Sequence, residues 1–553
     1  MRKRIERLLD GALASARQAG ELVAENVSAA GSIDAPKERQ HGDLASNVAL
    51  GMARAERKSP RAIAETLLHH LSDPHGLLAA TEIAGPGFIN FRLSDRFWHE
   101  ELASLLADDT LGVERVGAGR RVQVEFVSAN PTGPLTVGHG RNAVLGDSIA
   151  RLLEAVGCTV EREYYFNNAG RQMKVLGKSV EARYRELAEL PFDFPEDGYQ
   201  GAYIRDIARG LHEEHGAAIA AGGLEPFRER AEREIFADIR RTQDRLGITF
   251  DVYFNEDTLY SAGAIDSIVA DLDARGLIVR REGAVWLAGE KVGLPKDRVL
   301  IKGTGEPAYR LPDIAYHRNK LERGFDEIID VLGADHIEEH REVVAALAAL
   351  GFDVARIRPV IYQFVTLTRH GEQVKMSTRR AEYVTVDELL DEVGVDAVRF
   401  FFLCRKSDSH LEFDLELAKK RSNDNPVYYV QYAHARIMNL YGQAKLAGIE
   451  PPSGPPSPDD LAALREPEEF DVIRSLCSFG EVVNQSAASL EPHRVVFFLQ
   501  ELAAALHRFY NLHRVLGDEV PARMAARLAM LEAVRRVLRS GLDMLGVAAP
   551  ERM

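Results

Sequence analysis

A short apolar run, a loop rich in glycine and proline, and a helical pattern follow one another between residues 122 and 157. VQVEFV predicts a strand, ANPTGPLTVGHG a loop, and RNAVLGDSIARLLEAVG a helix with one apolar face that stops at Gly157. A second strand is predicted over about 160–166, and further strands at 326–332 and 358–367. Strand, loop, helix and strand form a βαβ unit, which predicts an α/β domain with a parallel sheet.

Three units are predicted along the chain. Residues 1–115 form a small α+β domain, because two helical patterns precede strand-like alternation around a Gly-Pro-Gly turn. Residues 116–415 form the parallel-sheet domain, with a largely helical insertion at about 175–260. The alternating Glu and Arg residues of this insertion favour a salt-bridged, solvent-exposed surface over a basic binding arm. Residues 416–553 have helical spacing almost throughout, which predicts an all-α helix bundle.

The charge balance limits the classes of partner. Asp plus Glu number 84 and Lys plus Arg 69, a net charge of −15, which argues against a protein coated in basic charge for non-specific nucleic-acid binding. A local basic surface remains compatible with it. The three cysteines are scattered without a CxxC pair, so neither a disulfide scaffold nor a Cys-rich zinc module is predicted. No run of about 18 apolar residues occurs, so we expect a soluble, cytoplasmic chain without a membrane partner.

The loop before the predicted helix has the chemistry of an anion site. It lies at a helix N-terminus, where backbone N–H groups and the helix dipole favour negative charge. Gly138 has no side chain, so a nucleotide base could approach the backbone closely. His139 beside it can donate a hydrogen bond to a ribose or phosphate oxygen. Taken alone, these few residues favour an ordinary helix-capping turn.

The longer segment VEFVSANPTGPLTVGHGRNAVLGD resembles the HIGH signature of class I aminoacyl-tRNA synthetases, in the form found in arginyl-tRNA synthetases. The second signature of that family, KMSK, is matched downstream by Lys375-Met376-Ser377-Thr378. HGDLASNVAL, EIAGPGFINFRL, REYYFNNAG, DNPVYYVQYAHARI and LAAALHRFYN extend the resemblance along nearly the full length. Two positions depart from the pattern. Thr136 replaces the first His of HIGH, and Thr378 replaces the last Lys of KMSK, with Arg379 and Arg380 beside it.

The resemblance implies an arginine–tRNA ligase. Such an enzyme forms arginyl-adenylate and pyrophosphate from L-arginine and ATP with Mg²⁺, and then transfers arginine to the 2′-hydroxyl of the terminal adenosine of tRNA(Arg). The resemblance assigns tRNA binding to 1–115, class I Rossmann-like catalysis to 116–415 and anticodon binding to 416–553. It further implies activation that depends on tRNA, a monomer, no DNA partner and no structural metal.

The resemblance also assigns residues to the reaction. The catalytic residues are His139, Lys375, Thr136, Ser377 and Arg379. The ATP-binding residues are Pro131, Gly138, His139, Gln363, Lys375 and Met376. His139 and the helix N-terminus would serve the α-phosphate, and Lys375 with a neighbouring arginine the departing pyrophosphate.

Choosing arginine requires carboxylates, because a planar guanidinium pairs with them in bidentate geometry. Glu125, Asp313 and Asp335 are predicted at the C-terminal ends of strands or in loops beside them, where such sheets bind ligands. The resemblance assigns arginine binding to these three and to Asn130 and Tyr309, whose ring could pack against the guanidinium. Without the resemblance, Glu125, Asp313 and Asp335 are three of 84 acidic residues, and each is a weak candidate.

Residues for tRNA are predicted at both ends of the chain. Phe88 and Asn90 match positions that arginyl enzymes use near the tRNA elbow. Tyr428, Tyr432 and Arg436 lie four residues apart on one helix face, where aromatic and Arg side chains can stack on unpaired bases. Burial of the two tyrosines in the bundle core is an equally good interpretation.

Other functions compete with this one. A small-molecule adenylate-forming or nucleotidyl-transferring enzyme would share the HIGH-like loop but leave the outer domains unexplained. A non-catalytic tRNA-binding paralogue would explain Thr136 and Thr378, but not the retention of His139 and Lys375. Among aminoacyl-tRNA synthetases, the glutamate enzyme should have a basic pocket. The cysteine enzyme needs zinc ligands that three scattered cysteines hardly provide.

Overall fold

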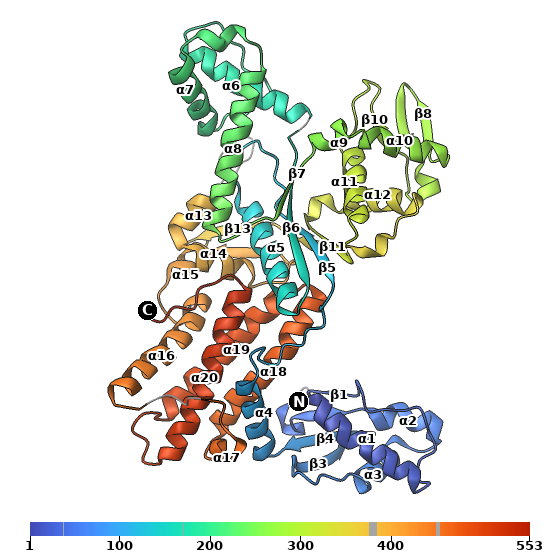
Figure 1. Cartoon of the computed structure of the whole chain (residues 1–553), viewed down its shortest axis with the longest axis vertical. Coiled ribbons are helices and arrows are strands. Elements are labelled where there is room, and N and C mark those ends of the chain that lie inside the picture. The colour runs from blue at the N-terminus through green and yellow to red at the C-terminus, as the bar shows by residue number, and fades with distance from the viewer. Residues whose placement is uncertain (37, 169, 375–383, 450–453) are drawn as a thin grey trace.

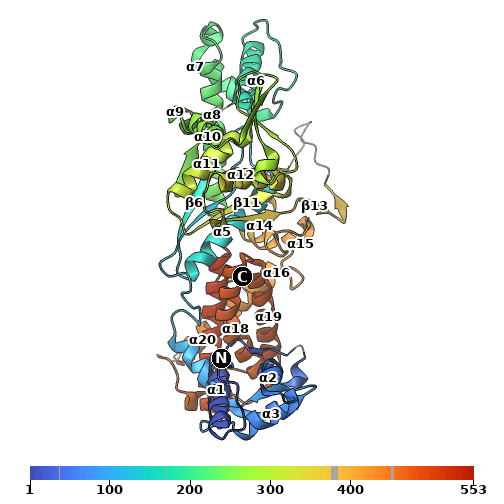
Figure 2. The ribbon, with the colours of Figure 1, turned by 90° about the vertical axis from the view of Figure 1, so that its right-hand side faces the viewer.

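The protein is an elongated molecule with three parts (Figures 1 and 2). The computed structural model describes residues 1–36, 38–168, 170–374, 384–449 and 454–553. The N-terminal domain and the C-terminal helices share one end, the main sheet lies in the middle, and helices α6–α8 project at the other end.

The central sheet confirms the predicted α/β class. Its five strands are all parallel, in the order β12–β11–β5–β6–β7. They are β5 (Arg121–Glu125), β6 (Thr159–Phe166), β7 (Val252–Asn255), β11 (Glu327–Gly333) and β12 (Ile357–Tyr362), and α5 (Val137–Ala155) connects the first two. The strand order reverses between β5 and β11. In such sheets the ligand crevice opens at this point, outside the carboxyl ends of the strands.

The structure differs in detail from the prediction at the helical insertion and at the last predicted strand. Besides α6 (Arg171–Leu187), α7 (Ala202–His215) and α8 (Glu225–Arg245), the segment 175–260 contains β7, which pairs with β6 at the edge of the central sheet. The apolar run 358–367 divides into β12 and β13 (Val365–Arg369), which belong to different sheets. Phe364, which is 64% exposed, marks the break. The sequence prediction missed this break, although polar Gln363 lies directly before Phe364.

A compact module between β7 and β12 was not predicted. Its antiparallel strands β8 (Ile278–Arg281), β9 (Ala284–Leu287) and β10 (Arg298–Ile301) are each four residues long, too short for a clear alternating pattern. Helices α9 (Asp257–Ser261), α10 (Ala264–Ala274), α11 (Arg310–Glu322) and α12 (Ile337–Ala349) complete it. These elements share a second hydrophobic core, in which Ile268, Leu272, Leu311 and Leu347 are fully buried.

The N-terminal domain is α+β, as predicted. Helix α1 (Arg2–Gln18) buries its apolar face at Ile5, Leu9, Ala12, Leu13 and Ala16. The sheet has the order β1–β2–β4–β3. Its strands are β1 (Ile33–Asp34), β2 (Leu44–Ser46), β3 (Leu78–Ala84) and β4 (Phe88–Leu93), beside α2 (Val48–Glu56), α3 (Pro60–His69) and α4 (Asp95–Ala107). The second predicted helix therefore begins later than expected, because LAS is a strand.

The C-terminal part is a helix bundle, as predicted. Its long helices are α16 (Pro426–Leu446), α18 (Pro467–Ser489), α19 (His493–Leu512) and α20 (Pro521–Met544). Short elements join it to the sheet domain: β14 (Glu372–Gln373), α13 (Val386–Val393), α14 (Val395–Phe402), β15 (Leu411–Asp414) and α15 (Leu415–Lys419). Helix α4 packs on α18, α20 and α17 (Pro458–Leu461), and α5 contacts α18 and α20, so the bundle bridges the other two parts. Within the described residues, no helix is long and apolar enough to cross a bilayer.

Candidate active site

The loop between β5 and α5 is held in a strained shape. Val127 and Ser128 have φ angles of 66° and 41°, in the left-handed region that a β-branched residue rarely adopts. The backbone N–H of Val127 donates to Oδ1 of Asn142 at 2.6 Å, and Oγ of Ser128 donates to Oε1 of Glu125 at 2.8 Å. These contacts offset the strain and fix the loop at the carboxyl end of β5.

His139 is oriented by Thr136. The backbone N–H of Thr136, the N-cap of α5, donates to Nδ1 of His139 at 3.1 Å, and Oγ1 of Thr136 lies 3.2 Å from the same nitrogen. A backbone N–H can only donate, so Nδ1 accepts and the ring proton is on Nε2. Burial lowers the pKa of His139. The ring is therefore neutral near pH 7 and presents Nε2–H as a hydrogen-bond donor.

The other described residues predicted to bind ATP lie around this helix N-terminus. Pro131 is buried in the loop. Above Gly138 the space is open, since an added Cβ would meet only Oγ1 of Thr136, at 3.9 Å. Gln363 follows β12, and its carbonyl accepts from Nη1 of buried Arg141 at 2.6 Å, which ties the end of β12 to α5. Burial also lowers the pKa of Arg141, to about 10.

Lys375, Met376, Ser377, Thr378 and Arg379 lie outside the described residues. The chain that follows them is anchored to the HIGH-like loop. The N–H of Val137 donates to the carbonyl of Val384 at 3.3 Å, and the N–H of Val386 donates to the carbonyl of Leu135 at 2.8 Å. The segment that begins at Val384 is therefore joined by backbone hydrogen bonds to the start of α5.

The acidic candidates reach the crevice from different kinds of element. Glu125 is the last residue of β5, and Asp335 lies in a 3-10 helix (Ala334–His336) directly after β11, both as predicted. The expected position of Asp313 was wrong, because it lies in the first turn of α11 rather than at a strand end. Pro312 in the same turn fits the start of a helix, where a missing N–H costs nothing.

Asp313 lies among other carboxylates, in a region of excess negative charge that we call the acidic pocket. Burial and repulsion from Glu339, Glu256 and Glu125 raise the pKa of Asp313 well above its usual value, and Lys320 offsets only part of this effect. Among the described residues, the Asp313 carboxylate has no ion-pair partner within contact distance. A cation entering this pocket would supply the missing charge.

Three of the candidates for arginine binding, Tyr309, Asn130 and Asp335, are exposed at the surface. Tyr309, the N-cap of α11, is 63% exposed, and the Lys302 ammonium lies 5.9 Å from its ring centre. Asn130 is exposed in the loop after β5. The Asp335 carboxylate is also exposed, 3.7 Å from Nε2 of His336. All three side chains are accessible to a ligand.

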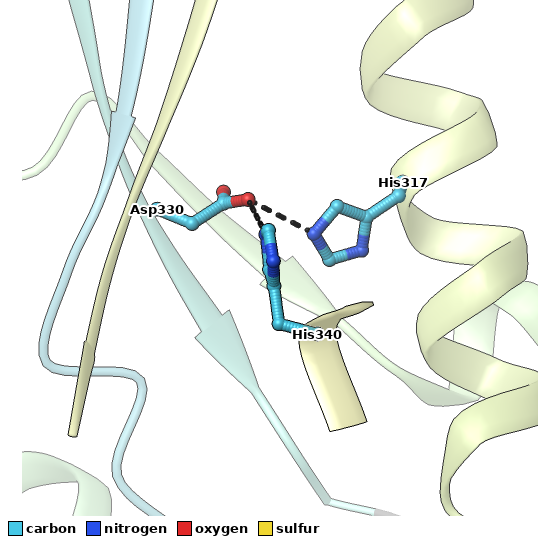
Figure 3. Close-up of side chains that lie close together, drawn as sticks. All are labelled: His317, Asp330 and His340. Carbon is cyan, nitrogen blue, oxygen red and sulfur yellow. Dashed lines mark hydrogen bonds and ion pairs between the residues drawn. The ribbon is translucent and has the colours of Figure 1, made fainter. Parts of the chain in front are cut away.

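A buried ionic cluster behind the pocket was missed by sequence reasoning. The ammonium of fully buried Lys320 donates to Oε2 of Glu125, and to Oδ1 of Asp330 at 2.7 Å. Nε2 of His317 and Nε2 of His340 each lie 3.1 Å from Oδ2 of Asp330 (Figure 3). One signal was available: Asp313, His317 and Lys320 have the spacing of a single helix face.

His317, Asp330 and His340 are the residues best placed to hold a metal ion. Their donor atoms lie within 4.8 Å of one another, and they form the single such group found among the described residues. However, the Lys320 ammonium already pairs with Asp330. A divalent cation beside it would add like charge in a buried site, so the set fits a hydrogen-bonded cluster better than a metal centre.

The aromatic residues of α16 lie at the edge of the bundle rather than in its core. Tyr428 and Tyr432 are half-buried, and their rings stack with centres 6.0 Å apart and planes 9° apart. His507 of α19 continues the stack, 5.7 Å from Tyr432. The Arg436 guanidinium lies 6.0 Å from the Tyr432 ring centre and 3.7 Å from that of Tyr510. These five residues form a partly exposed ladder of flat side chains between α16 and α19.

The two N-terminal candidates share strand β4 but differ in exposure. Phe88, its first residue, is 40% exposed. Asn90 is buried, opposite Ala45 of β2 and Glu82 of β3 in the strand register. Phe88 is therefore the member of the pair that a ligand can touch directly.

Three family models match successive parts of the chain. The arginyl-tRNA synthetase N-terminal domain matches residues 3–93, the catalytic domain of class I tRNA synthetases (R) matches 101–402, and the DALR anticodon binding domain matches 430–553. The catalytic-domain match alone spans more than half of the chain. The chain belongs to the arginyl-tRNA synthetase family.

Whole-length relatives agree with this assignment to the arginyl-tRNA synthetases. The arginine–tRNA ligase of Desulfotalea psychrophila is 50% identical over 523 residues, which cover 94% of each chain. That of Salinibacter ruber is 47% identical over 542 residues, covering 94% of this chain and 95% of its own. The solved arginyl-tRNA synthetase of Thermus thermophilus, at 23% identity, covers both chains fully with a TM-score of 0.73, which shows a shared fold.

Proposed function

We propose that the protein joins L-arginine to tRNA(Arg), in two steps that both use the crevice at the β5–β11 switch point. MgATP and arginine first form arginyl-adenylate and pyrophosphate, and the arginyl group then passes to the 2′-hydroxyl of the terminal adenosine. The observation that carries the proposal is the carboxylate pocket around Asp313, beside a helix N-terminus that presents His139. One site thus offers excess negative charge to a cationic amino acid and hydrogen-bond donors to a phosphate.

Arginine selection follows from the charge of the pocket. The guanidinium would lie against Asp313 and Glu125, with Tyr309 stacked on its plane and Asn130 and Asp335 at the entrance. A neutral side chain of the same shape would leave the buried carboxylates unpaired. Loss of such pairing lowers kcat/KM by roughly 10⁴-fold where a site is built around polar partners.

Adenylate formation requires positioning and charge stabilisation more than proton transfer. A carboxylate oxygen of arginine attacks the α-phosphorus of ATP, and the bond from that phosphorus to the bridging oxygen of pyrophosphate breaks. Nε2–H of His139 and the N-terminus of α5 would hold the α-phosphate oxygens as charge develops on them. Pro131, Gly138 and Gln363 would border the nucleotide.

The residues between Val374 and Val384 complete the proposal on the pyrophosphate side. Lys375 and Arg379 would supply positive charge to the leaving group, with Met376 and Ser377 between them. What supports this role is the anchoring of Val384 and Val386 to the HIGH-like loop, which returns the chain to the start of α5.

Binding of tRNA is proposed to involve both outer domains. The ladder on α16, with Tyr428, Tyr432 and Arg436, offers flat faces and a cation to unpaired anticodon bases. Phe88 would contact the tRNA elbow, with Asn90 two positions along the same strand. We infer that the enzyme acts as a monomer in the cytoplasm.

ATP–pyrophosphate exchange tests the proposal. The expected result is exchange that requires arginine and tRNA(Arg) together and is absent with glutamate or cysteine. Folded protein that supports no exchange, with or without tRNA, would contradict the proposed reaction. His139→Ala serves as the inactive control.

A further inference from the structure

We propose that Asp330 is a positioning residue for arginine selection, acting on Glu125 through Lys320 and on Asp313 through His317. The inference rests on the arginine pocket proposed above and deepens it. Asp330 itself is fully buried on β11 and does not face the crevice. Asp330 would act through Lys320 and His317, whose side chains connect it to the acidic pocket.

The first connection runs to Glu125. Asp330 on β11 lies opposite Glu125 on β5 in the strand register, and the Lys320 ammonium bridges their carboxylates. Burial alone would lower the pKa of Lys320, but Asp330 and Glu125 together raise it above its usual value, so the bridge stays charged. Ser128 holds the other oxygen of Glu125 at 2.8 Å. Both oxygens of Glu125 are therefore fixed before any ligand binds.

The second connection runs to Asp313. Nδ1 of His317 lies 2.8 Å from the Asp313 carbonyl, and Nε2 lies 3.1 Å from Oδ2 of Asp330. The His317 ring therefore spans the gap between the backbone carbonyl of Asp313 and the Asp330 carboxylate. His340, from α12, contacts the same Oδ2 atom and also holds Asp330 (Figure 3). The first turn of α11, which carries Asp313, is thus tied to β11.

Because Glu125 and Asp330 share the Lys320 ammonium, this contact determines how much negative charge is left in the acidic pocket. With two carboxylates around it, the ammonium neutralises Glu125 only in part, and the remaining negative charge is available to a guanidinium. Without the charge of Asp330, Lys320 would pair with Glu125 alone. Loss of Asp330 should therefore weaken arginine binding even though no contact to arginine is removed.

Asp330→Asn tests this directly, with tRNA-dependent exchange as the assay. We expect the KM for arginine to rise about tenfold, while the KM for ATP and kcat change by less than about threefold. Asp147→Asn is the matched control. Asp147, on α5, is an equally buried carboxylate that pairs with Arg399, Arg151 and Arg162 and not with Lys320, His317 or His340. It measures the cost of losing a buried charge without any effect on arginine selection.

His340 provides a milder second test. His340→Leu removes a donor to Asp330, whereas His340→Gln keeps a donor near the position of Nε2. We expect His340→Leu to raise the KM for arginine about threefold and His340→Gln to restore it, with Tm equal in the two variants. A positioning role predicts this rescue, and a purely structural role does not.

The outcomes separate the two proposals. If Glu125→Gln and Asp313→Asn leave the KM for arginine unchanged, the arginine pocket itself is wrong. If those variants raise it but Asp330→Asn and His340→Leu do not, the pocket stands and the positioning role is overturned. Equal changes in the KM for arginine and ATP, or the same change in Asp147→Asn, also overturn it. The purified protein could also contain one equivalent of zinc that the His340→Leu variant lacks. In that case His317, Asp330 and His340 form a metal site and not a hydrogen-bonded cluster, which overturns the proposal.

Discussion

The backbone N–H of Thr136 donates to Nδ1 of His139 across 3.1 Å. Thr136, which replaces the first His of the HIGH pattern, therefore orients His139, which matches the pattern. This contact is one half of a capping box, in which a side chain in the first turn reaches back to the N-cap N–H. It satisfies a free donor of α5 and fixes the tautomer of the histidine in one step. Thr136 contributes through geometry, where a histidine would also offer a ring nitrogen to the nucleotide.

Substitutions of His139 and Thr136 should lower kcat by different amounts. Removing the donor in His139→Ala should lower kcat for exchange about 10²–10³-fold, the usual loss for one preorganised donor to a developing charge. Thr136→Val keeps the backbone N–H and removes only Oγ1, so its loss should stay below about tenfold. Steady-state exchange kinetics distinguish the two. An equal loss in both variants would show that Thr136 acts on the substrate itself.

Arginine binding should become tighter as the pH rises. The raised pKa of Asp313 means that its carboxyl keeps its proton to higher pH in the free enzyme than an ordinary aspartic acid. A guanidinium favours the ionised form, so binding releases a proton below the raised pKa, and the dependence levels off above it. Calorimetry in two buffers of different ionisation enthalpy measures the released proton. Asp313→Asn should remove both the proton release and the pH dependence, whereas a dependence that survives would assign it to another group.

Changes on the α16 ladder should affect tRNA and spare the small substrates. Tyr432→Ala should raise the KM for tRNA about tenfold, in line with about 1–3 kcal/mol for one stacked base. Arg436→Ala should also reduce the salt dependence of tRNA binding. Tyr441→Ala is the control on the same helix, because the Tyr441 hydroxyl donates to the Leu528 carbonyl inside the bundle. If all three variants behave alike, the effect is one of stability.

Sequence reasoning could predict what depends on neighbours in the chain. The βαβ unit from β5 to β6 and the amphipathic face of α1 follow from local periodicity, and both signatures are short motifs. The cluster behind the pocket does not: Lys320 reaches Glu125 across 195 positions, and no local pattern encodes that contact. Asp313 was expected at a strand end or in a loop beside one, whereas it lies in the first turn of α11, because the helix boundary there was not recognised in the sequence. The break at Phe364 was missed although the polar residue Gln363 interrupts the apolar run beside it.

In the proposed reaction, carboxylates select the amino acid by its charge. The most direct test compares arginine with citrulline, its neutral analogue of nearly the same shape, as substrates for exchange in the presence of tRNA(Arg). The unaltered enzyme should prefer arginine by roughly 10⁴-fold in kcat/KM, and Asp313→Asn should reduce that preference about a hundredfold. A preference that is unchanged in Asp313→Asn would contradict selection by this pocket.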